Sequence, residues 1–352
     1  MVICINVLNV NQALAEGLRL IAYHGRERPS RNGPVLAMPE PVATTYQDPT
    51  ARVLFCDDRD ANPFFHLMES IWMLAGENDV EWPAAFNKRM REYSDDGVIH
   101  GAYGYRWRTH FGVDQLTKII DMLRAEPTTR RAALGMWDPT VDLGASKKDL
   151  PCNTMVYFDA QDGKTLDMTV TCRSNDMWWG AYGANAVHFS ILHEVVATGA
   201  GLALGRYTQF SNNLHLYTDI VTPGLVGTAR TQRLEDLSVR AAAQDRYTTE
   251  LVGILRRRAK AEIGPVRQPV MTTTLTYFTS DCHLLMSPNA LDHTYYNEFF
   301  NNVAKPMLAA WRAYKAKQYD EASRLVSTIT AEDWRVACAQ WLLRRSLARA
   351  HV

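Results

Sequence analysis

Apolar and polar positions follow two different spacings along this chain, and each spacing predicts its own kind of element. Residues 2–7, VICINV, predict a strand. The next stretch, NQALAEGLRLIAYHG, predicts a helix that starts at an asparagine cap and ends at Gly25. A second helix is predicted for NPFFHLMESIWMLAGEND, because its apolar residues keep helical spacing as far as Gly76. A third, GVDQLTKIIDMLRAEP, is closed by Pro127.

Alternation with a period of two predicts a pair of strands in the middle of the chain. In TMVYFDAQDGKTLDMTVTC the two strands are joined by a turn at Asp162–Gly163. RRAALGMWDP predicts a short strand before them, and NAVHFSILHEVVATGAGL predicts an apolar helix at the centre of the core. From about residue 230 the pattern is helical and charged, with one strand-like interruption, VMTTTLTYF. We therefore expect one α+β domain over residues 1–352, in which the last part, from about residue 230, is a partly helical C-terminal extension.

Composition and charge mainly argue against certain kinds of partner. Lys+Arg and Asp+Glu balance at 38 each, so we expect no direct nucleic-acid binding and no attraction to anionic membranes. The six cysteines lack the short repeated spacing of a zinc site, which predicts no metal and a reducing compartment. The first residues lack the basic region of a signal peptide, and no apolar run is long enough to cross a bilayer. These features predict a cytoplasmic protein without a membrane partner.

One cysteine stands out because it follows a proline and precedes a predicted buried strand, in LPCN. Cys152 fits two interpretations, an inert packing residue or a nucleophile. A nucleophilic thiol needs positive charge nearby, and Arg31, Arg130, Arg131 and Arg173 are the arginines beside predicted loops or strand ends. If they converge, they form a phosphate clamp and lower the pKa of the thiol. Taken singly, each arginine also fits a solvated surface residue.

Three further positions carry polar groups that the pattern leaves open. Asn185, in CRSNDMWWGAYGANAVHFS, fits either a helix N-cap or an amide that reads a planar base edge. His215 and Tyr217, in NNLHLY, point the same way on a strand and suit a sugar hydroxyl or a satisfied polar pair. Glu69 lies in an apolar helix that offers it little polar face.

The order of these motifs resembles thymidylate synthase and its relatives, the pyrimidine nucleotide hydroxymethylases. The resemblance runs from about Arg31 to Tyr217, and it comprises Arg31 itself, HLMESIWMLAGEND, GAYGYRWR, RRAALGMWDP, LPCN, CRSNDMWWGAYGANAVHFS and NNLHLY. Each motif alone is weak, but seven in the family's order are specific. The resemblance implies the α+β fold of that family, with packed helices and a mixed sheet that forms the interface of a homodimer.

The resemblance also implies a role for each matching position. Cys152 would add to C6 of a pyrimidine nucleoside monophosphate, and C5 would then take a one-carbon unit from 5,10-methylenetetrahydrofolate, the cosubstrate. Glu69 would manage protons through ordered water, Tyr103 would help to remove the C5 proton, and Asn185 would read the base. The remaining implied contacts are the 5′-phosphate for Arg31, Arg173 and Ser174, the same phosphate across the dimer for Arg130 and Arg131, the ribose 3′-hydroxyl for His215 and Tyr217, and the folate for Asp176 and Trp72.

Three departures from the synthase pattern bear on the product, because a hydroxymethylase admits water where a synthase transfers hydride. The chain ends in the basic helix WLLRRSLARAHV instead of a short apolar tail. Met90 stands near the position of a screening tryptophan, and Asn153 follows Cys152 where synthases have histidine. These departures favour a hydroxymethylase.

The base is the more open choice. An asparagine amide can be turned to read uracil or cytosine, and an extra residue lies between Gly180 and Asn185. We expect dUMP to be converted to 5-hydroxymethyl-dUMP. The alternatives are a dCMP or CMP hydroxymethylase, then a thymidylate synthase making dTMP, and, outside enzymes, a nucleotide-binding scaffold. The resemblance implies that such an activity fits either a phage that replaces a DNA base, in which case the enzyme would work in the host cytoplasm, or the synthesis of a nucleoside antibiotic.

Overall fold

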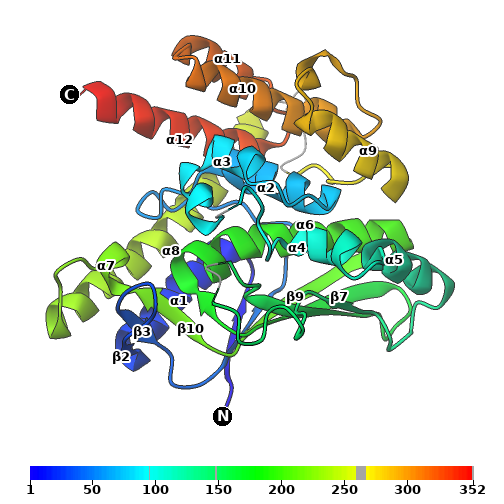
Figure 1. Cartoon of the computed structure of the whole chain (residues 1–352). Helices are drawn as coiled ribbons and strands as arrows, with labels where there is room; N and C mark the ends of the chain where they lie inside the picture. Colours follow the sequence, from blue (N-terminus) through cyan, green and yellow to red (C-terminus); the bar gives the residue numbers. More distant parts are fainter. Residues whose placement is uncertain (95, 147–148, 259–266, 351–352) are drawn as a thin grey trace.

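A computed structural model describes residues 1–94, 96–146, 149–258 and 267–350, and Figure 1 shows how their elements are arranged. The described strands form two sheets. The larger has the order β1-β4-β9-β7-β6-β5, and the smaller has the order β2-β3-β10-β8. Their bounds are β1 Ile3–Val7, β2 Arg26–Arg28, β3 Val35–Ala37, β4 Val42–Tyr46, β5 Ala133–Gly135, β6 Asn153–Asp159, β7 Thr165–Cys172, β8 Asn175–Asp176, β9 Ala203–Ser211 and β10 Leu214–Tyr217.

Both sheets are mixed. In the larger sheet β1 pairs with β4, and β7 with β9, in parallel, whereas the other neighbours are antiparallel. In the smaller sheet β10 lies antiparallel to β3 and parallel to β8. The predicted hairpin is confirmed as β6 and β7, whose turn contains Gly163 at φ 67°. The side chains of β7 alternate between buried and half-buried, as the period of two requires.

Helices cover the larger sheet in successive layers (Figure 1). The buried helix α6 crosses above the strands, α2 lies over α6, and α9 to α12 lie beyond α2. On another side α8 packs along α1. The bounds are α1 Val10–His24, α2 Pro63–Ala75, α3 Glu81–Phe86, η1 Lys88–Tyr93, α4 Tyr103–Tyr105, η2 Arg106–His110, α5 Gln115–Ala125, η3 Met177–Ala184, α6 Asn185–Ala200, α7 Thr218–Val221, α8 Gly227–Arg258, α9 Leu275–Met286, η4 Ala290–Asp292, η5 Phe300–Ala304, α10 Lys305–Lys315, α11 Tyr319–Ser327 and α12 Glu332–Ala350.

Capping residues explain where the early helices start and stop. The cap of α1 is Asn9, whose side chain accepts from Gln12 N at 3.0 Å, two residues before the stretch from which the sequence predicted the helix. In α2 the Asn62 side chain accepts from Phe65 N at 3.2 Å, and Gly76 ends the helix in the left-handed conformation at φ 85°. Local sequence therefore fixes both ends of α2.

One predicted element is wrong. The strand-like interruption at residues 270–278 forms no strand: residues 270–274 are irregular, and α9 begins immediately after Thr274. Val270 and Met271 are buried, and the Val270 backbone N–H donates to Glu194 Oε1 at 2.7 Å instead of to a ladder. A run of β-branched threonines favours a strand only where a neighbouring strand can pair with it.

No helix in the described part of the chain is long and apolar enough to cross a membrane.

Candidate active site

Cys152 lies immediately before β6, and Arg173, immediately after β7, holds its backbone in place. The two strands pair so that Asn153 faces Cys172, which brings the two flanking residues together. Arg173 N donates to the Cys152 carbonyl at 2.9 Å, and its guanidinium donates to the carbonyls of Pro151 at 2.9 Å and Leu150 at 3.1 Å. The same guanidinium places Nη2 3.9 Å from the Cys152 sulfur. One arginine thus shapes the cysteine loop and supplies positive charge to the thiol.

The pKa of Cys152 is raised, although two of the predicted arginines act to lower it, as expected. Burial is the largest cause, because a thiolate in a desolvated site loses its hydration. Arg173 and Arg31 each act to lower the pKa of this thiol, and the carboxylate of Asp149 opposes them. The arginines therefore limit the rise without reversing it, and the resting thiol is protonated at neutral pH.

Tyr103 approaches the cysteine from α4. Its hydroxyl accepts from the backbone N–H of Asn153 at 3.4 Å, and burial raises the pKa of Tyr103 well above its usual value, with Cys152 as the next cause. Gly104 lets α4 pack directly on α2, since a Cβ there would lie 1.7 Å from the carbonyl oxygen of Met73. The motif GAYGYRWR thus positions a phenol beside the Cys152 loop.

Glu69 has a buried partner that sequence reasoning missed. Its Oε2 lies 3.1 Å from Nε2 of His188 on α6, and the two side chains are only 12% and 4% exposed. The two atoms make no well-aligned hydrogen bond with each other and have no other partner among the described residues. The ring of His66 stands edge-on to His188, with centroids 6.5 Å apart. The carboxylate and the imidazole form a nearly dry acid–base pair between two packed helices.

The smaller sheet places His215, Tyr217 and Asp176 together. His215 on β10 is in register with Asp176 on β8, and the His215 and Tyr217 rings have centroids 5.3 Å apart. Burial raises the pKa of the Asp176 carboxyl and lowers that of His215, while Asp176 acts to raise the latter. Asp176 also caps η3, accepting from Trp179 N at 2.7 Å. A carboxylate, an imidazole and a phenol therefore share one side of the site.

Asn185 is oriented by a chain of polar side chains. Its Nδ2 donates to Asn175 Oδ1 at 3.2 Å, and Asn175 Nδ2 donates to Ser211 Oγ at 3.0 Å. The residues between Gly180 and Asn185, where the sequence predicts an extra residue, lie in η3, a π-helical segment with non-helical backbone at Tyr182 and Gly183. Asn185 itself lies at the first turn of α6, where an N-cap was the alternative; the structure gives α6 no side-chain cap bond.

The predicted phosphate-binding residues divide into two groups. Arg31, on the turn between β2 and β3, is near enough to act on the thiol, and Arg173 and Ser174 follow β7 directly. Arg130 and Arg131 are exposed and precede β5, which pairs with β6 so that Ala133 faces Tyr157. This register places Arg130 and Arg131 at the end of β6 remote from Cys152, so within one chain they do not join the site.

Two positions that the family resemblance singled out, Trp72 and Met90, have surroundings that the sequence does not reveal. Trp72 is 2% exposed, and its indole N–H donates to Asp79 Oδ2 at 3.0 Å, so its predicted folate contact stays a prediction. Met90 is half-buried on η1, whereas Tyr93 of the same segment is 44% exposed. Burial raises the pKa of Tyr93, and Tyr217 and Asp176 add to the rise, which puts Tyr93 beside the site. An aromatic residue three positions after Met90 was the signal that could have revealed it.

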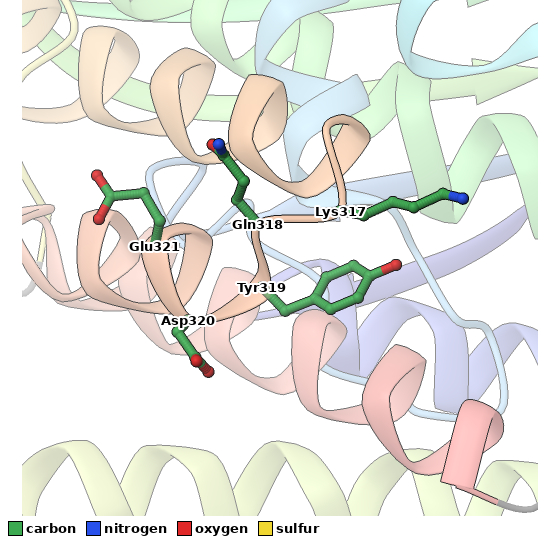
Figure 2. A pocket seen from close by; sticks show the side chains of 5 residues that line it. All are labelled: Lys317, Gln318, Tyr319, Asp320 and Glu321. Carbon is green, nitrogen blue, oxygen red and sulfur yellow. The ribbon is translucent and has the colours of Figure 1, made fainter.

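Two surface hollows lie away from these residues. One, of about 470 Å³, is at the turn between α10 and α11 and is lined by Lys317 to Glu321 (Figure 2). Another, of about 450 Å³, lies between α3 and α10. Neither is lined by Cys152 or its neighbours. Among the described residues, no group of His, Cys, Asp and Glu is arranged to hold a metal ion.

The mixed sheet, the cysteine loop and the buried carboxylate define a nucleotide-modifying enzyme of the kind that the sequence resembles, and comparison with known proteins confirms that class. The chain belongs to the thymidylate synthase family, whose model, described as thymidylate synthase, matches residues 18–260. The family identifies the chain as a one-carbon transferase, and enzymes of this family use methylenetetrahydrofolate as cosubstrate.

Three similar proteins come from phages and bear the name deoxyuridylate hydroxymethyltransferase. That of Pseudomonas phage M6 is 46% identical over 351 residues, which cover 98% of this chain and 95% of that protein. That of Bacillus phage SP01 is 39% identical over 191 residues, 51% of this chain and 50% of that protein. That of Delftia phage PhiW-14 is 34% identical over 220 residues, 59% of this chain and 60% of that protein.

Proposed function

We propose that this chain hydroxymethylates dUMP at C5, with methylenetetrahydrofolate as the one-carbon donor, and releases 5-hydroxymethyl-dUMP. The observation that carries the proposal is the 46% identity, over nearly its whole length, to a protein named deoxyuridylate hydroxymethyltransferase. The placement of Cys152, Arg173 and Tyr103 supports it, because these residues meet at one point from separate elements. Since the relatives are phage proteins, we infer that the chain works in the cytoplasm of an infected bacterium.

The nucleotide would be held at both ends. Arg31, Arg173 and Ser174 would bind its 5′-phosphate, and His215 with Tyr217 would bind the 3′-hydroxyl. Arg130 and Arg131, which lie far from Cys152 in their own chain, would reach the phosphate in a partner subunit. The enzyme would therefore act as a homodimer.

The Cys152 thiol would lose its proton to solvent as its sulfur attacks C6. The arginines that hold the 5′-phosphate would keep the base close to this sulfur. The new S–C6 bond makes C5 electron-rich, so that C5 takes the one-carbon unit that the folate supplies. Tyr103 is next to the thiol loop and would help to remove the C5 proton. Expulsion of tetrahydrofolate leaves a methylene group on C5, to which water adds before the S–C6 bond breaks.

Glu69 and His188 would activate that water. A carboxylate and an imidazole 3.1 Å apart can accept the proton of a water as its oxygen bonds to the methylene carbon. Because the two side chains are only slightly exposed, bulk solvent would have little access to this bound water. A pair of acid–base groups at this point supports hydration of the intermediate, which is the step that separates a hydroxymethylase from a synthase.

Asn185 would read uracil. Its amide can accept from N3–H through Oδ1 and donate to O4 through the second Nδ2 hydrogen, since the first is donated to Asn175. Turning the amide for cytosine would bring two amide oxygens together, unless Asn175 also turned and Ser211 became the donor. The present direction of the hydrogen bonds supports a preference for one base, and we assign that base as uracil.

The test is a competition between dUMP and dCMP with methylenetetrahydrofolate, in which mass spectrometry identifies the product. We expect a hydroxymethyl group on dUMP and no dihydrofolate absorbance, and no product from Cys152→Ser. A methyl group with stoichiometric dihydrofolate would mean a thymidylate synthase, and consumption of dCMP would overturn the assignment of the base.

A further inference from the structure

A short acidic loop before α2 is bound at every carboxylate by arginines from the last third of the chain. The acidic loop is Asp57-Asp58-Arg59-Asp60. Arg344 on α12 binds Asp57 and also reaches Asp60 at 3.1 Å, and Arg345 binds Asp60 at 2.5 Å. From α8, Arg240 binds Asp58 at 3.1 Å, and Gln244 accepts from the backbone N–H of Asp57 at 2.8 Å.

Arg59, in the middle of this loop, points the opposite way, into the protein. It is 4% exposed, its Nε donates to the Trp178 carbonyl at 2.5 Å, and its guanidinium carbon lies 4.2 Å from the ring centroid of Trp179. Gly183 leaves room for it, because a Cβ there would lie 3.2 Å from Arg59 Nη2. Burial lowers the pKa of Arg59 to about 10, with Asp176 opposing, so the side chain stays charged at neutral pH.

The loop holds its arginine in a constrained backbone. Asp60 has φ 47°, in the left-handed region, and its N–H donates to the Cys56 carbonyl at 3.2 Å. Three carboxylates within four residues repel one another unless cations neutralise them. The helices α8 and α12 supply those cations from outside, which allows the single cation of the loop to turn inward.

Arg59 and Asp176 both contact Trp178 and Trp179. Asp176 accepts the backbone N–H groups of Trp178 and Trp179, while Arg59 binds the Trp178 carbonyl and stacks on Trp179. Any shift of the acidic loop therefore shifts the start of η3, which carries the proposed folate-binding side of the site.

We propose that the C-terminal helices position the folate side of the active site: Arg344 and Arg345 fix the acidic loop, and the loop fixes Arg59 against Trp178, Trp179 and Asp176. This inference rests on the proposed folate contact at Asp176. Arg344 and Arg345 are positioning residues, and both lie beyond residue 260, where the match to the family model ends. Half-exposed ion pairs of this kind contribute little to the stability of the fold. We therefore expect their main effect to be on the position of the acidic loop.

The experiment compares ligand affinities of the full-length Arg344→Gln/Arg345→Gln variant with those of the unmodified chain. Calorimetry in the presence of dUMP should show tetrahydrofolate affinity falling roughly 2- to 30-fold, while dUMP affinity changes less than about twofold. Arg324→Gln is the matched control, because Arg324 lies on α11 in the same extension and, among the described residues, its side chain pairs only with Glu321; this variant should leave both affinities unchanged.

A variant in the acidic loop tests the same contact from its other side. Asp60→Asn removes the charge but tolerates φ 47°, so it should reproduce the loss of tetrahydrofolate affinity. Adding Asp60→Asn to the Arg344→Gln/Arg345→Gln variant should lower tetrahydrofolate affinity no further, because the substitutions remove the same contact. Unchanged tetrahydrofolate affinity, equal losses for tetrahydrofolate and dUMP, or additive losses would each overturn the inference. A methylated product from the unmodified chain would instead overturn the proposed function and leave this test in force.

Discussion

Arg173 Nη2 lies 3.9 Å from the sulfur of Cys152, while Nε of the same guanidinium donates to the carbonyl of Pro151 at 2.9 Å. The arginine therefore holds the thiol and its backbone as one unit. The cysteine loop is also tied to Tyr103, whose hydroxyl accepts from the Asn153 N–H, so the proposed nucleophile and the proposed proton-transfer group are linked. If this is the nucleotide site, as proposed, we expect it to bind the nucleotide in one position relative to the sulfur.

The first prediction concerns the pH dependence of thiol reactivity. Burial raises the pKa of Cys152, so alkylation by iodoacetamide should be slow at pH 7 and accelerate as the pH passes 9. Arg31→Gln removes a charge that lowers this pKa and should move the profile further to high pH. Peptide mass spectrometry after timed labelling measures the rate, and the exposed Cys4 serves as an internal reference for the reagent. A profile centred below pH 8 would contradict the dominance of burial.

The second prediction concerns His188. Replacing it with asparagine removes the imidazole that contacts Glu69, so kcat should fall by about 10²-fold while KM for dUMP changes little. Glu69→Gln should cause a loss at least as large, and the double variant should be no slower than Glu69→Gln, because the two residues act as a pair. Steady-state kinetics with product analysis measures this. If His188→Asn kept the kcat of the unmodified chain, His188 would have a packing role and no role in proton transfer.

The third prediction concerns selection of the base. Asn175→Leu removes the acceptor that orients Asn185, and the preference for dUMP over dCMP should fall roughly tenfold. Asn175→Asp keeps an acceptor for Asn185 Nδ2 and can accept from the Ser211 hydroxyl, so it should retain the preference. The ratio of kcat/KM values for the two nucleotides is the measurement. A ratio that Asn175→Leu leaves unchanged, at normal thermal stability, would exclude orientation by Asn175.

Local sequence was sufficient where an element is defined by its own caps and periodicity. Asn62 and Gly76 bound α2, and Asp162–Gly163 turns the hairpin, just as the pattern predicts. The family resemblance, which depends on the order of motifs, was confirmed by the match over residues 18–260. These features need no knowledge of distant residues.

Features that depend on distant partners were not predictable. Arg344 meets Asp57 across 287 positions, and the Asn175–Ser211 hydrogen bond spans 36. The direction of the Cys152 pKa shift depends on burial, which a count of nearby arginines cannot supply. The threonine-rich stretch at residues 270–278 was predicted as a strand, but no strand lies beside it to complete a ladder in the described part of the chain. Tertiary contacts decide each of these cases.

The last prediction concerns stability and the junction between α12 and the rest of the chain. Asp333, in the first turn of α12, is buried, and burial raises its pKa to about 7, with Arg267 and Arg52 opposing. Its folded pKa lies above the unfolded value of about 3.9, so its contribution to stability is complete below pH 4 and is lost as the pH rises through 7.

Asp333→Asn mimics the protonated carboxyl and keeps the oxygen that accepts from Trp334 N. Its stability relative to the unmodified chain should therefore rise between pH 5 and pH 8 by about 2.5 kcal/mol. Urea unfolding at the two pH values measures the difference, and groups common to both proteins cancel. A relative stability that falls over this range would mean that Asp333 is ionised in the folded protein and that its two arginines outweigh burial.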